Sequence, residues 1–188
     1  MKRQMTDTEK TFFNTIQFEE LNGTKYTSNL EVEAKTILFT KQAMRFNNEQ
    51  LVFESLPRIA KSLLMAMIVN DVSDELSTTF FECYTTLNRM AINRVVGYNI
   101  MEEGHYLTAS EVENLAKVHK GVCLSTIKLL DGELKEFAKQ LKKHPKDFGI
   151  KLTNAGYKET LKVINELMND LRKEANDSYQ RAINLIKD

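Results

Sequence analysis

The side chains best suited to metal chemistry lie in two short stretches of the sequence. Glu102 and His105 form a Glu-x-x-His pair, a spacing that places both side chains on one face of a helix. Helical bundles that hold two metal ions use two such pairs together with two further glutamates. The sequence has one pair, and Gly104 interrupts it. We therefore interpret Glu102 and His105 as a polar helix end rather than a metal site.

His119 and Cys123 form the second candidate, because residues four apart on a helix can share one metal ion. A metal or haem site here needs a further protein ligand, and Cys83 on a neighbouring helix is the partner we consider. However, the spacing also places His119 and Cys123 on an apolar helix face, where a thiol behaves as a small hydrophobic group. We predict that they are reduced core residues, with no metal and no cofactor.

Motifs of common enzymes are absent from the sequence. It contains no P-loop, no Gly-x-Ser-x-Gly and no His-Glu-x-x-His. It also lacks an arginine followed four to six residues later by a histidine, the pattern on which small helical ribonucleases of the HEPN type rely. We therefore predict that the protein is not an enzyme.

The charge balance argues against a nucleic-acid-binding protein. Lysine and arginine together number 26, and so do aspartate and glutamate. Proteins that hold phosphate backbones usually carry excess positive charge. The cationic cluster at residues 139–146 lies at the C-terminal end of a predicted helix, where cations interact favourably with the helix dipole.

A short stretch of the chain resembles a ligand-binding helix of bacterial chemoreceptor sensor bundles. The stretch is Thr-Leu-Asn-Arg at residues 86–89, followed by Ile92 and Arg94. This resemblance implies a four-helix bundle that senses a small molecule, with Arg89 and Arg94 as anion contacts. The transmembrane helices that flank the sensor bundle in that family are not found in this sequence.

The elements that position these residues are expected to be helices. Apolar residues recur mostly at intervals of three and four, and glycine and proline number only seven and two. We predict an all-α fold, an elongated antiparallel four-helix-type bundle over residues 28–188 with an N-terminal helical appendage over residues 1–27. The predicted helices are approximately residues 6–21, 28–46, 49–70, 73–103, 108–143 and 154–188.

Local signals mark several helix ends and faces. Thr108 or Ser110 is expected to cap the fifth helix, and Pro57 either kinks the third helix or starts a new one. Gly104 is expected to end the fourth helix. The core-facing residues of that helix are predicted to be Val72, Leu76, Phe80, Cys83, Leu87, Met90 and Val95.

The third predicted helix contains seven consecutive apolar residues, from Leu63 to Val69. Such a run covers the whole circumference of a helix and leaves no face for water. Either other helices of the same chain enclose it, or another chain covers it. We favour the second alternative, which predicts a partner-binding face formed by Leu64, Met65, Met67 and Ile68.

A helical bundle without a catalytic constellation is expected to be an interaction protein. Its partner would be another protein or a second copy of the chain, and its role that of an adaptor, chaperone, inhibitor, immunity factor or accessory subunit. The small-molecule sensor is the alternative. The sequence lacks an export signal, and its longest apolar run is far shorter than the roughly 20 residues that span a bilayer. We therefore expect a cytoplasmic protein.

Overall fold

The computed structural model of the chain describes residues 30–97 and 107–186. These residues form an all-α bundle without strands, which confirms the predicted fold class. The α-helices are α2 (Leu30–Arg45), α3 (Glu49–Val69), α4 (Asp74–Val96), α5 (Ala109–Lys143) and α6 (Asn154–Leu185), and the short 3-10 helix η2 (Pro145–Phe148) joins the last two. The predicted appendage and the Glu102–His105 pair lie outside the described residues.

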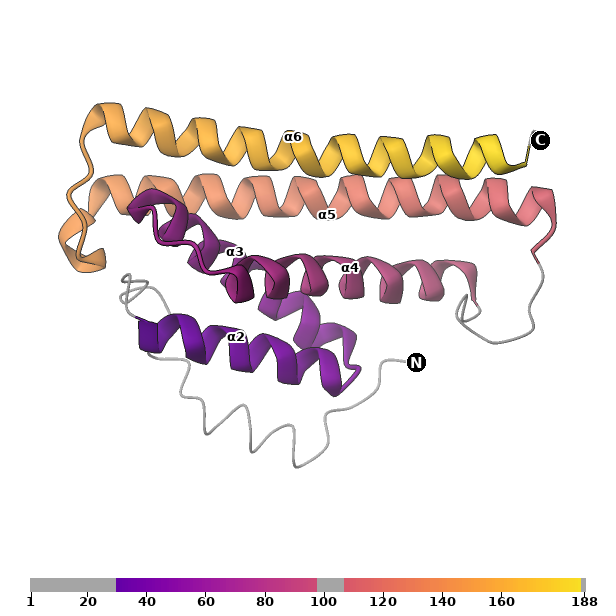
Figure 1. The fold of residues 1–188 in the computed structure, drawn as a ribbon, viewed down its shortest axis with the longest axis horizontal. Coiled ribbons are helices and arrows are strands. Elements are labelled where there is room, and N and C mark those ends of the chain that lie inside the picture. The colour runs from indigo at the N-terminus through magenta and orange to yellow at the C-terminus, as the bar shows by residue number, and fades with distance from the viewer. Residues whose placement is uncertain (1–29, 98–106, 187–188) are drawn as a thin grey trace.

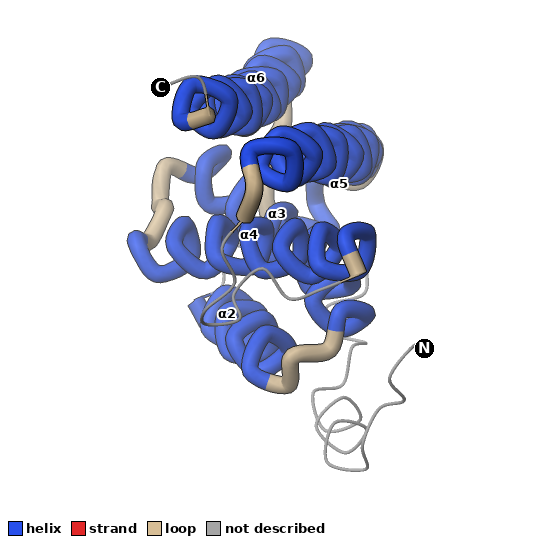
Figure 2. The backbone as a smooth tube through the Cα atoms, turned by 90° about the vertical axis from the view of Figure 1, so that its right-hand side faces the viewer, coloured by secondary structure: helices blue, strands red, loops and turns tan. Residues whose placement is uncertain are grey.

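Successive helices alternate in direction and form three layers (Figure 1). Helices α5 and α6 lie side by side along the length of the molecule, α3 and α4 lie beneath them, and α2 covers the opposite side. Figure 2, a view nearly along α5 and α6, shows that α4 crosses beneath them at an angle. The two middle helices therefore run obliquely to the other three.

Side-chain caps fix the beginnings of the helices. Thr108 and Glu111 form the predicted capping box of α5, with each residue's side chain bonded to the other's backbone N–H. Ser73 caps α4 through a hydrogen bond from the Leu76 backbone N–H, and Thr153 caps α6. These hydrogen bonds satisfy backbone N–H groups that the helices themselves leave unpaired.

The predicted end of the fourth helix is wrong. Helix α4 ends at Val96, and Gly97 takes the left-handed conformation with φ 77° while its N–H donates to the Asn93 carbonyl. The predicted core-facing residues at the two ends of this helix are also wrong, because Val72 and Val95 are exposed. Ile92 is buried at the C-terminal end instead.

Helix α3 is the central helix of the bundle. It continues through Pro57 and contacts α2, α4, α5 and α6. Because neighbours surround it, Leu64 is only 1% and Met65 only 2% exposed. Met67 and Ile68 are half-buried and pack against the same core.

The placement of Leu64 and Met65 fits the first alternative for the apolar run, enclosure within the chain. They are therefore not on the surface for a partner in this fold, contrary to the face we predicted. Contact with a partner through Met67 and Ile68 stays a prediction.

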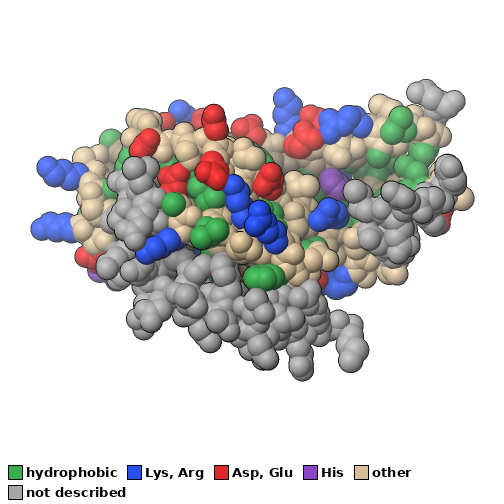
Figure 3. Space-filling view, turned by 60° about the horizontal axis from the view of Figure 1, so that its bottom comes forward, with side chains coloured by type: hydrophobic (Ala, Val, Ile, Leu, Met, Phe, Trp, Pro, Cys, Tyr) green, Lys and Arg blue, Asp and Glu red, His purple; other side chains and the backbone are tan. Residues whose placement is uncertain are grey.

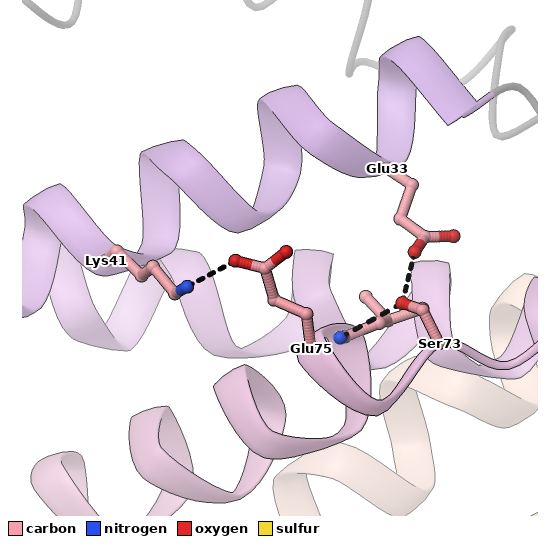
Figure 4. A network of polar contacts seen from close by, with 5 residues as sticks. Glu33, Lys41, Ser73 and Glu75 are labelled. Atoms are coloured by element: carbon pink, nitrogen blue, oxygen red, sulfur yellow. Dashed lines mark hydrogen bonds and ion pairs between the residues drawn. The ribbon is translucent and has the colours of Figure 1, made fainter.

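Polar contacts fasten α2 to the start of α4 (Figure 4). Lys41 on α2 pairs with Glu75 at 2.5 Å, and the Ser73 hydroxyl donates to a Glu33 carboxylate oxygen at 2.5 Å. The Ser73 oxygen also accepts from the Leu76 N–H at 3.2 Å, so one hydroxyl serves both the cap and the contact. Exposed ion pairs stabilise little, so the apolar core supplies most of this contact energy.

Candidate functional site: two grooves beside helix α4

A polar groove of roughly 340 Å³ lies among α4, α5 and α6. It forms because α6 packs mainly on α5, while α4 packs on a different side of α5 (Figure 2). Its polar lining residues come from all three helices and include the histidine–cysteine pair of the sequence analysis. They are Tyr84, Thr85, Asn88, Arg89, His119, Cys123, Glu174 and Ser178.

Asn88 is almost fully buried at this groove, with 3% of its surface exposed. Its Oδ1 atom accepts a hydrogen bond of 2.7 Å from the Thr126 hydroxyl on α5. Its Nδ2 atom is buried and forms no hydrogen bond with a described residue. Burial raises the pKa of the neighbouring Tyr84 hydroxyl, and the Asn88 side chain opposes that shift only in part. The amide thus offers an unfilled donor beside the groove.

His119 and Cys123 meet as their spacing predicted. The Cys123 sulfur lies 3.7 Å from His119 Nε2 and 3.9 Å from Nδ1. Burial raises the pKa of the Cys123 thiol and lowers the pKa of His119, although the nearby Glu174 carboxylate acts to raise the latter. Both groups are therefore kept neutral, which does not suit a nucleophilic thiolate.

The third metal ligand that we considered lies elsewhere. The Cys83 thiol donates to the Val52 carbonyl on α3 at 3.7 Å, and burial raises its pKa to about 12. Within residues 30–97 and 107–186, no three histidine, cysteine or acidic side chains converge on one point. The His119–Cys123 pair therefore lacks a described partner for metal binding.

The structure separates the two arginines of the chemoreceptor-like stretch. Arg89 lines the polar groove, whereas Arg94 pairs with Glu49 of α3 at 2.7 Å. At about 100° per residue, five positions turn the second arginine roughly 140° away from the first. One ligand in the polar groove is thus next to Arg89 but not next to Arg94.

An apolar groove of roughly 570 Å³ lies on the other side of α4, between α3 and α5. Two large hydrophobic residues line it and remain exposed, Phe53 by 48% and Val95 by 59%. The remaining apolar lining comes from α4 and α5, namely Leu87, Ala91, Val118, Val122 and Leu129. Our sequence analysis missed this groove because it placed Val95 inside the core.

The described surface carries no single-sign patch on the face drawn in Figure 3, where acidic and basic side chains are interspersed. No helix of the described residues is both long enough and apolar enough to cross a bilayer. No family model matches the sequence, and no curated protein or solved structure matches it.

Proposed function

We propose that the protein is a non-catalytic interaction protein that binds an apolar helix in the groove between α3, α4 and α5. The exposure of Phe53 and Val95 on opposite helices of that groove carries the proposal. Large apolar side chains flanking an apolar groove are typical of sites that receive the apolar face of a helix. The occupant belongs to another protein or to a second copy of the chain.

Polar side chains at the edges of the groove suit a bound helix that has polar residues at its ends. The Glu49–Arg94 ion pair lies along the groove, and Ser125 adds a hydroxyl from α5. Between them the lining is mostly apolar, so the bound helix needs anchors three and four residues apart. The balanced surface charge supports a protein partner rather than a nucleic acid.

We propose a cytoplasmic location for the protein. Cys83 and Cys123 are both free thiols, buried on different faces of the bundle. A reducing compartment maintains cysteines in this state.

Photo-cross-linking tests the groove directly. A photoreactive phenylalanine analogue is placed at position 53 or 95 of the full chain, and a matched control carries it at Glu166, an exposed position on α6. We expect discrete adducts from positions 53 and 95 but not from 166. A second copy in the groove gives an adduct of twice the chain mass, and another protein gives a different mass.

A blocking variant makes the test specific. Ala91→Glu puts a charge into the groove lining and is expected to abolish the adducts. Ala155→Glu makes the same charge change at an exposed position on α6, outside the groove, and serves as the matched control. Equal adducts from position 166, or adducts that persist in Ala91→Glu, would contradict the proposal.

A further inference from the structure

The polar groove among α4, α5 and α6 contains two donor groups without a described acceptor. Asn88 Nδ2 is buried and forms no hydrogen bond with any residue of the ranges 30–97 and 107–186. Arg89, the next residue along α4, lines the same groove and forms no ion pair with a described residue. Buried donors are almost always paired in folded proteins, and an unpaired one is destabilising. A ligand that presents acceptor oxygens would pair both groups.

We propose that this groove binds a small organic monocarboxylate with an apolar body, held by Asn88 and Arg89. A carboxylate accepts several hydrogen bonds and complements the positive charge of a guanidinium. This binding is independent of the helix-binding groove on the other side of α4.

The remaining lining accounts for the apolar body. Ile92, Leu171 and Ala175 provide an apolar wall from α4 and α6. The groove volume, roughly 340 Å³, lies at the lower end of the range for small-molecule sites. A carboxylate at Asn88 and Arg89 thus leaves room for a short hydrocarbon chain against this wall.

The charges favour a single carboxylate over two. Glu174 lines the groove from α6, and its carboxylate pairs with Arg181 at 2.6 Å. His119 is kept neutral by burial and offers no second cation. A second negative charge on the ligand would lie next to the Glu174 carboxylate or against apolar side chains. Both surroundings are unfavourable for a charge, so we expect the groove to disfavour dicarboxylates.

The experiment uses the full chain and a defined panel of probes. Acetate, butyrate and hexanoate are titrated at constant ionic strength, with hexylamine, 1-hexanol and adipate as controls. Thermal denaturation reports stabilisation of the native state, and NMR chemical shifts report binding at the same concentrations. We expect saturable stabilisation that increases from acetate to hexanoate and is weaker with each control.

Two arginine variants locate the site. Arg89→Gln removes the cation of the groove and is expected to lower hexanoate affinity at least about tenfold, as loss of a charged hydrogen bond does. Arg94→Gln changes the same residue type on the same helix, but in the other groove, and is expected to leave affinity unchanged. Both positions are exposed, so both variants should fold.

Several results would overturn the proposal. They are no saturable effect of any carboxylate on the wild-type chain, equal binding of hexylamine, and wild-type affinity in Arg89→Gln. The first of these would mean that water alone satisfies Asn88. Equal losses in the two arginine variants would also overturn it, because the effect would then reflect net charge.

Discussion

Replacing Leu64 by alanine tests whether α3 is enclosed by its own chain. The side chain is 1% exposed, so the substitution removes three fully buried carbon atoms. At about 0.8 kcal/mol for each buried carbon, the transfer contribution is about 2.4 kcal/mol. The cavity left in the core adds to this, and we expect a total loss of about 3–4 kcal/mol.

Urea denaturation followed by far-ultraviolet circular dichroism measures this loss. With a slope of about 2 kcal/mol per molar urea, the midpoint should fall by about 1.5–2 M without a change of slope. Val95→Ala is the matched control on the exposed surface and should cost less than about 0.5 kcal/mol. The Leu64→Ala loss should not depend on protein concentration, because the contacts lie within one chain. A loss below about 1 kcal/mol, or one that varies with concentration, would refute the enclosure.

Three further outcomes follow from the groove and its surroundings. Leu171→Ala on α6 should destabilise the protein by about 2–3 kcal/mol in the same assay, at the lower end for core leucines because the residue borders the groove. Thr126→Val leaves Asn88 Oδ1 without its donor and should cost about 1–3 kcal/mol, whereas adding Asn88→Leu should recover most of that loss. Burial lowers the pKa of His119, so the unfolded chain binds the proton more readily and the contribution of His119 to stability is lost as the pH falls below 6.5. His119→Gln should therefore reduce the acid sensitivity of the urea midpoint, and an unchanged sensitivity would contradict this.

The helix beginnings could be predicted because their signals are local. Thr108 and Glu111 are three residues apart, and this spacing alone defines a capping box. The end of α4 could not be assigned in the same way, because Gly97 and Gly104 are both plausible stops. The structure ends α4 at the first of them. Val95 lies within α4 whichever glycine ends the helix, so its wrong placement was a separate error about which face of the helix is buried. That second error concealed the apolar groove.

The sequence predicted that the Leu63–Val69 run loses most of its contact with water, but it did not predict which chain covers it. A helix that is apolar on all sides must lose contact with water, whichever chain covers it. Leu64 and Met65 could be covered either by helices of the same chain or by another chain. The path of α3 beneath α5 and α6 decides this, and no local sequence signal specifies that path. The pairing of His119 with Cys123 was predictable from their spacing, whereas the separation of Arg89 from Arg94 appears only when both are placed on α4.

Asn88 is distinguished from the other buried polar residues by its position beside an opening. The hydroxyl oxygens of Ser62 and Thr79 are also buried without a described partner, yet neither residue lines either groove. Neither groove therefore offers these two hydroxyls a ligand. Asn88 lines the groove, and the hydrogen bond from Thr126 to its Oδ1 restrains the amide there. A restrained donor next to a guanidinium that pairs with no described residue favours binding, since the amide then loses little side-chain freedom when a ligand arrives.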